Sequence, residues 1–246
     1  MHEPERRVCL LREKTISRMS WKNLGAIILL SLLSISVPSF SGLSAQDVPS
    51  SSRSREVISR VRPALTTQLA GQGLHFGSPI FIRIFKEEKE LEVWVRQGKD
   101  FRLFKNYPVC SYGPGVLGPK RKDGDCQAPE GFYLVGPRQM NPLSQFHLSF
   151  DLGYPNGYDR AQGATGYAIM VHGNCVSVGC YAMGDKAIEE IYALADAALR
   201  EGQPSFHVHI FPFRMTDVNM RRHRESEWYP FWENLKEGYD HFEGGP

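Results

Sequence analysis

The sequence lacks any apolar run long enough for the repeated crossings of a polytopic membrane protein. A transmembrane helix needs about 20 apolar residues, whereas the apolar run at 24–37, in a chain of 246 residues, has 14. An excess of charge is also absent, because 29 Lys and Arg residues stand against 27 Asp and Glu residues. The net charge of +2 gives no support to nucleic-acid binding, which favours a strongly basic face. No heptad pattern, glycine period or longer repeat is present, which excludes coiled coils, collagen and repeat arrays.

The short apolar run belongs to a targeting segment instead. It follows the basic residues Arg12, Lys14, Arg18 and Lys22 and precedes a stretch of small residues, which is the order found in signal peptides. We therefore expect residues 1–45 to be a signal peptide or an uncleaved N-terminal anchor. The protein is then exported, and it contacts a membrane only if this segment is retained.

Hydrophobic periodicity predicts a mainly β domain with accessory helices in the rest of the chain. Residues 46–78 are expected to form a polar linker and a short helix over 54–72, and residues 215–246 an aromatic helical tail packed on the domain. Asp185–Arg200 is the clearest helix, because its apolar residues share one face. The expected strands are 79–85, 91–96, 101–109, 132–135, 146–150, 167–171 and 206–213.

Reactive residue types are densest at 171–185, VHGNCVSVGCYAMGD, between an expected strand and the expected helix. A helix dipole and nearby backbone N–H groups would favour the thiolate of Cys180. Because an ordinary thiol has a pKa of about 8.5, a nucleophilic Cys180 also needs a base, and His172 is the local candidate. Gly179 permits a sharp turn, and its N–H is a candidate oxyanion donor. The alternative is an inert disulfide between Cys175 and Cys180.

These motifs resemble the active-site motif of the L,D-transpeptidase catalytic domain family, also called YkuD-like. His172-Gly173 is followed by Ser177-Val178-Gly179-Cys180, where the family has His-Gly and then Ser/Thr-His-Gly-Cys. The resemblance covers about residues 79–214 and is greatest to the YafK-like branch. The matching stretches of that branch are LGPK at 117–120, APEGFY at 128–133, FHLS at 146–149, GYPN at 153–156 and CYAM at 180–183.

The resemblance implies a β-sandwich-like L,D-transpeptidase catalytic domain over residues 79–214 with a cysteine acyl-transfer mechanism. Cys180 would attack a carbonyl beside meso-diaminopimelate and form a thioester, with His172 as general base and the Gly179 N–H as oxyanion donor. The implied partners are peptidoglycan stem peptides in the periplasm, and neither a metal nor an organic cofactor is implied. Four residues of the matching stretches are candidates for substrate binding: Ser177, His147, Tyr154 and Asn156.

Two departures from the family pattern leave the outcome of the reaction open. Val178 replaces a His, so that His172 is the remaining local base. Tyr181 and Ala182 stand where many members have an apolar residue and then Arg or Asn, so a side chain that could bind a substrate carboxylate is missing. Hydrolysis that releases a lipoprotein from peptidoglycan, as implicated for some branch members, is therefore an alternative. A non-catalytic, exported cell-wall-binding module is a third hypothesis.

The other histidines and cysteines have structural as well as functional interpretations. His147 either lines the substrate cleft or is a core residue. His207 and His209 point to one face of a strand, but zinc needs three or four ligands and no third is apparent, so no metal site is expected. Cys110 and Cys126 flank a charged loop and are a candidate disulfide pair.

Overall fold

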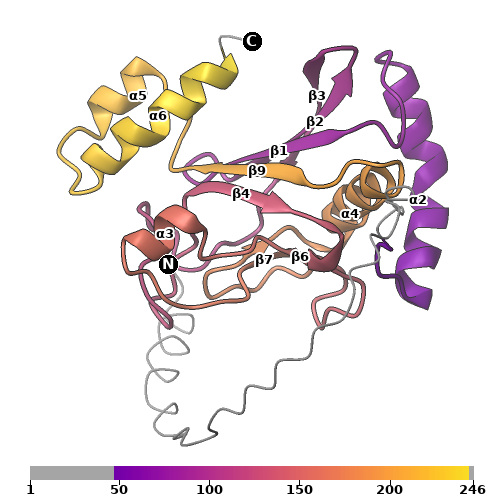
Figure 1. Ribbon diagram of the computed structural model, residues 1–246, viewed down its shortest axis with the longest axis horizontal. Helices are drawn as coiled ribbons and strands as arrows, with labels where there is room; N and C mark the ends of the chain where they lie inside the picture. The colour runs from indigo at the N-terminus through magenta and orange to yellow at the C-terminus, as the bar shows by residue number, and fades with distance from the viewer. Residues whose placement is uncertain (1–46, 244–246) are drawn as a thin grey trace, which may run out of the picture.

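Two β-sheets form the framework of the protein, and helices pack against both (Figure 1). The computed structural model describes residues 47–243, so the targeting segment expected at 1–45 lies outside the described residues. Within residues 47–243, no helix combines the length and the apolar character needed to cross a membrane.

The larger sheet has five strands, in the order β3 (Asp100–Pro108), β2 (Glu90–Gln97), β1 (Ile80–Phe85), β9 (Phe206–Phe211) and β4 (Gly131–Val135). Neighbouring strands run antiparallel, except that β1 and β9 are parallel, with Ile82 opposite Val208. Every residue of β1 is buried. This central strand is therefore covered on both faces, which explains why its sequence, IFIRIF, is almost continuously apolar.

The smaller sheet has four short strands, in the order β5 (Met140–Asn141), β6 (Ser149–Asp151), β7 (Met170–His172) and β8 (Tyr181–Ala182). β6 pairs antiparallel with β5 and β7, whereas β7 and β8 run parallel. This parallel pair brings the His-Gly motif at the end of β7 close to the Gly-Cys motif that precedes β8.

The central helix is α4 (Asp185–Arg200), which contacts β1 of the larger sheet, β6 and β7 of the smaller sheet, and the N-terminal helix α2 (Ser52–Ala70). The amphipathic pattern of α4 is reflected in a long series of buried residues between Ile188 and Leu199. Three further helices are α3 (Gly157–Ala161), α5 (Asp217–Arg222) and α6 (Tyr229–Glu243). Figure 1 shows α5 and α6 together on the side of the larger sheet that faces away from α4.

Two hydrophobic cores follow from this arrangement. The main core lies between the two sheets, α4 and α2, and includes Ile82, Phe150 and Leu194. The second core lies under α5 and α6, where Phe211 and Trp232 are buried. Burying side chains of this size contributes about 1.5–3 kcal/mol each, so these contacts stabilise the packing of α5 and α6 on the larger sheet.

The mainly β fold with accessory helices is confirmed, but two expected strands begin later than the apolar pattern suggests. The segment expected at 146–150 forms a strand only from Ser149, because His147 has a φ of +67°. The segment expected at 167–171 forms a strand only from Met170, since Ala168 has a φ of +55°. Left-handed backbone at non-glycine residues interrupts a strand, and apolar periodicity does not reveal it.

Candidate active site

Strand pairing places Cys180 next to the strand that carries His172. Cys180 directly precedes β8, and the parallel register sets His172 opposite Ala182. Two residues further back in this register, Cys180 lies beside Met170, whose N–H donates to Cys180 Sγ at 3.4 Å. Side chains two residues apart along a strand share a face. Cys180 therefore lies diagonally across the parallel register from His172, at an offset of two residues.

The imidazole of His172 is held in one tautomer by its surroundings. His172 is 3% exposed, and its Nδ1 bonds to the carbonyl oxygen of Gly173. Because a carbonyl can only accept, Nδ1 carries the proton and Nε2 has the lone pair. Burial lowers the pKa of His172, opposed by the bond to Gly173. The ring is thus neutral near pH 7, which is the form that a general base requires.

An aromatic ring on the surface covers this imidazole. The ring centroids of Phe146 and His172 are 4.8 Å apart, although Phe146 is itself 40% exposed. The backbone beside it is fixed, because the Gly173 N–H donates to the carbonyls of Phe146 at 3.0 Å and Leu148 at 3.1 Å. The spacing of Phe146 in the sequence is that of an ordinary strand residue, so the sequence alone does not mark it as part of the site.

The side chain of Ser177 closes the loop before Cys180. Its Oγ donates to the carbonyl oxygen of Cys180 at 2.6 Å and accepts from the Gly179 N–H at 3.1 Å. Asp185, the first residue of α4, accepts from the Asn174 N–H at 2.7 Å. Ser177 therefore shapes the loop from within. The Gly179 N–H can bind an oxyanion only after it leaves Ser177.

Gly179 is required by both its conformation and its neighbours. Its φ is +122°, and a Cβ at this position would lie 2.9 Å from the carbonyl oxygen of Gln127. A Cβ at Gly113 would similarly lie 3.0 Å from the Gly179 nitrogen. The backbone at positions 113 and 126–127 thus packs directly against the residue before the thiol and fixes its place.

The structure corrects both disulfide hypotheses. Cys110 is bonded to Cys175, with Cα atoms 5.4 Å apart and a sequence separation of 65 residues. The physical reason is that the chain after β3 runs along β8, where the Cys110 N–H donates to the Ala182 carbonyl at 2.8 Å. The expected Cys110–Cys126 pair is therefore wrong. The alternative Cys175–Cys180 disulfide is also wrong, and Cys180 keeps its thiol.

Two of the candidate substrate-binding residues have their side chains committed to the fold. Tyr154 is buried, and its hydroxyl donates to the Lys120 carbonyl at 3.2 Å. Asn156 caps α3 by accepting from the Asp159 N–H at 2.8 Å, and it donates to the Phe132 carbonyl at 3.0 Å. Neither side chain is included in the site proposed below.

The three other histidines considered in the sequence analysis, His147, His207 and His209, lie in two different places. His147 is half-buried, and its Nε2 is 2.8 Å from Oε1 of Glu189 on α4. His207 and His209 lie on β9, with ring centroids 5.6 Å apart, which confirms that they share a face. Across residues 47–243, no group of three or more His, Cys, Asp or Glu side chains is arranged to hold a metal ion.

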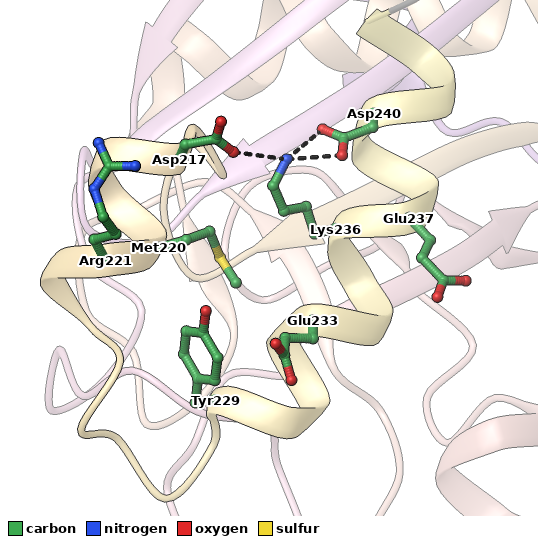
Figure 2. Close-up of a pocket in the computed structure, with 8 residues that line it drawn as sticks. All are labelled: Asp217, Met220, Arg221, Tyr229, Glu233, Lys236, Glu237 and Asp240. Carbon is green, nitrogen blue, oxygen red and sulfur yellow. Dashed lines mark hydrogen bonds and ion pairs between the residues drawn. The ribbon is translucent and has the colours of Figure 1, made fainter.

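A hollow between α5 and α6 contains neither Cys180 nor His172 (Figure 2). Lys236 points toward Asp217 and Asp240, with Nζ–Oδ distances of 3.5 and 2.7 Å. The cation in this acidic hollow is therefore already paired. The candidate catalytic residues lie instead at the junction of β7 and β8.

The structure thus places Cys180 directly before β8, beside the parallel strand β7, which ends in the buried His172. The chain belongs to the L,D-transpeptidase catalytic domain family (YkuD), whose family model matches residues 79–235. The resemblance inferred from the sequence is thus confirmed, and the match extends through α5 into α6.

Relatives at higher identity lie in the expected branch of the family. The protein named "Putative L,D-transpeptidase YafK" of Escherichia coli (strain K12) is 50% identical over 167 residues, which are 68% of this chain and 68% of that protein. The protein of the same name in Escherichia coli O157:H7 matches equally well.

Similarity to solved structures is lower. The helical cell shape determining protein Pgp2 from Campylobacter jejuni gives a TM-score of 0.44 at 22% identity, covering 61% of this chain and 55% of that one. Bd1075 of Bdellovibrio bacteriovorus gives 0.38 at 22% identity, covering 55% of this chain and 48% of that one. The chain thus spans about half the length of these two proteins.

Proposed function

We propose that the protein is a cysteine acyltransferase that acts in the periplasm on peptidoglycan stem peptides, at the bond next to meso-diaminopimelate. The observation that carries this proposal is that Cys180 directly precedes β8, next to the parallel strand β7 that ends in His172, with Nε2 of the imidazole unprotonated. Membership of the L,D-transpeptidase family supports the type of reaction and the type of substrate.

The proposed reaction uses the groups of this chain in two half-reactions. His172 Nε2 accepts the proton of Cys180, and the thiolate attacks the peptide carbonyl. When the tetrahedral intermediate collapses, the C–N bond breaks, the proton passes from the imidazolium to the departing amine, and a thioester remains on Cys180. An incoming amine then loses a proton to His172, attacks the thioester and restores the thiol.

Hydrolysis is the second candidate, because water can replace the amine without any new catalytic group. At the position where many relatives carry Arg or Asn, this chain has Ala182, which is buried and paired with Ser111 and His172. Ala182 offers no cation that could bind a substrate carboxylate. Hydrolysis that releases a peptidoglycan-linked lipoprotein is therefore the alternative outcome.

Mass spectrometry of muropeptides tests this proposal. Purified protein is incubated with disaccharide-peptides, with and without an added D-amino acid as acceptor. Exchange products indicate transfer, and shortened peptides indicate hydrolysis. Both are expected to vanish in Cys180→Ala and to persist in Val178→Ala, a matched change at an exposed neighbour in the same loop.

A non-catalytic cell-wall-binding module would give a different result. It would bind peptidoglycan and leave every muropeptide unchanged, with Cys180→Ala and the parent protein behaving alike. Turnover that survives in Cys180→Ala would also overturn the proposal, because it would assign the chemistry to another group.

A further inference from the structure

A cavity outside the Cys180 site lies between the loop at 119–121, α3 and the start of α6. Its volume is about 320 Å³, which lies in the range of about 300–1,000 Å³ typical of ligand sites. Its walls come from three segments that are far apart in the sequence. The residues that matter for its chemistry are Arg121, Tyr158, Gln162, Glu227, Trp228 and Phe231.

Aromatic rings form the apolar part of this cavity. Tyr158 and Phe231 are stacked, with centroids 5.8 Å apart and planes inclined by 27°, yet Tyr158 remains 47% exposed. The guanidinium carbon of Arg121 lies 5.4 Å from the centroid of the Trp228 ring. Trp228 is seated on Gly118, where a Cβ would approach the indole nitrogen to 2.3 Å. Close contact with the backbone at Gly118 therefore holds the Trp228 ring in place.

The polar groups of the cavity fall into two sets. Asp159 and Lys120 are occupied within the fold, by the Tyr133 hydroxyl at 3.0 Å and by Asp125 at 2.6 Å. By contrast, among residues 47–243 the side chains of Gln162 and Glu227 have no hydrogen-bond partner, although both line the same cavity. Amide and carboxylate groups of this kind are available to a ligand.

One chain segment connects the cavity with the nucleophile. Ala164 lines the cavity, and four residues later the carbonyl oxygen of Ala168 lies 3.8 Å from Cys180 Sγ. Tyr167, between them, is 69% exposed. One short segment therefore joins the cavity lining to the surroundings of the thiol, and a polymeric substrate that contacts both places would follow it.

We propose that this cavity binds a sugar unit of the glycan strand of peptidoglycan; the proposal rests on the proposed function. A pyranose ring has a face of C–H groups that packs on aromatic rings, and its hydroxyl and acetamido groups hydrogen-bond at its edge. Such a ring is neutral and can therefore accept the mixed charges of Arg121 and Glu227. A stem peptide rich in carboxylates would meet Glu227 with like charge, which disfavours it as the occupant.

Kinetics with two matched substrates test the proposal. One substrate is a disaccharide-tetrapeptide, and the other is the same tetrapeptide without sugar. Tyr158→Ala is expected to raise KM for the sugar-bearing substrate by about tenfold, the size of a lost aromatic contact of 1.4 kcal/mol, with kcat unchanged. KM for the sugar-free peptide should not change. Gln162→Ala is a second variant, and Arg221→Ala, on the exposed rim of the hollow in Figure 2, is the control.

Direct binding separates this proposal from the assignment of the active site. Calorimetry of Cys180→Ala with a trimer of N-acetylglucosamine should show binding that Tyr158→Ala abolishes. An unchanged ratio of the two KM values in both variants would overturn the proposal, and so would an equal loss for the sugar-free peptide, which would assign the cavity to the stem peptide. If the parent protein turns over neither substrate, the proposed function fails, and the calorimetry still decides the sugar site.

Discussion

At the scale of the residue, the central feature is a histidine whose charge and tautomer are both set by the fold. Burial of His172 favours the neutral ring, and the Gly173 carbonyl keeps the proton on Nδ1. The family's second histidine is replaced by Val178, which is 38% exposed and cannot exchange protons. The mechanism proposed above therefore depends on one imidazole.

Replacing His172 tests this dependence. We expect His172→Ala to lower turnover by about 10²–10⁴-fold, the usual contribution of general-base catalysis. Alkylation of Cys180 should move to higher pH, toward the ordinary thiol pKa of about 8.5. The measurement is the pH profile of iodoacetamide labelling, with His207→Ala as control. An unchanged profile in His172→Ala would assign the base to another residue.

A second residue gives a prediction about acid stability. His209 lies between Phe81 and Phe132, with centroids 4.6 Å from each, and burial lowers its pKa to about 3. The unfolded chain binds this proton near pH 6.5, so the stability due to His209 is present above that pH and falls as the pH drops toward about 3.

His209→Phe removes this proton-linked loss and keeps an aromatic ring. The parent protein should lose about 2 kcal/mol through this residue between about pH 6.5 and pH 4.5, and the variant should lose correspondingly less. Urea denaturation at several pH values measures the difference. Parallel pH curves for the two proteins would mean that His209 does not titrate in this way.

At the scale of the element, the loop between β7 and β8 is held at three places. Ser177 binds the backbone of Cys180, Asp185 binds Asn174, and the disulfide joins Cys175 to Cys110. These contacts fix a loop that ends at Cys180, the proposed nucleophile. A loop that had to order itself on substrate binding would lose part of the binding free energy to entropy.

The disulfide prediction follows from its long sequence separation of 65 residues. Chain-entropy reasoning gives a stabilisation of about 4 kcal/mol for such a loop. Cys175→Ser and Cys110→Ser should each lower the free energy of unfolding by a similar amount. The double variant should show the same decrease as either single variant, because one bond is lost in all three. Part of the activity should remain, because Cys180 is outside the bond. Additive losses in the double variant would contradict this pairing.

The same loop shows what the sequence could and could not predict. The sequence predicts His172, Gly179 and Cys180 as site residues because one short motif contains all three. The Cys110–Cys175 bond was missed, because the end of β3 reaches β8 only through tertiary packing. β5 and β8 were missed as well, since strands of two residues have no periodicity to detect. The cavity at α3 is lined by three segments that are far apart in the sequence. No local sequence pattern therefore predicts it.

At the scale of the whole molecule, a buried ion pair connects the second core to the framework of the site. Lys86 and Glu130 are both inaccessible to solvent, with an N–O distance of 2.9 Å. Glu130 also accepts from the Gly118 N–H at 2.7 Å and from Trp232 Nε1 at 2.8 Å. The carboxylate thus joins Lys86, directly after β1, to the backbone at Gly118 and to α6. The same loop packs against Gly179.

Glu130→Gln should leave the Lys86 charge buried without a counter-ion and lower the free energy of unfolding by about 3–5 kcal/mol. Hydrogen exchange should increase in α6, since the bond from Trp232 is weakened. Adding Lys86→Met removes the unpaired charge and should restore part of the loss. A Glu130→Gln variant within about 1 kcal/mol of the parent protein would show that the pair does not hold these elements together.

The most direct test of the central claim is intact-protein mass spectrometry during turnover. After brief mixing with a stem tetrapeptide and acid quenching, the protein should carry the mass of the acyl donor without its leaving group. Peptide mapping should place the adduct on Cys180, and hydroxylamine should remove it as expected for a thioester. Cys180→Ala should show no adduct. Turnover without any adduct under the same quench, or an adduct that persists in Cys180→Ala, would contradict the assignment of Cys180 as the nucleophile.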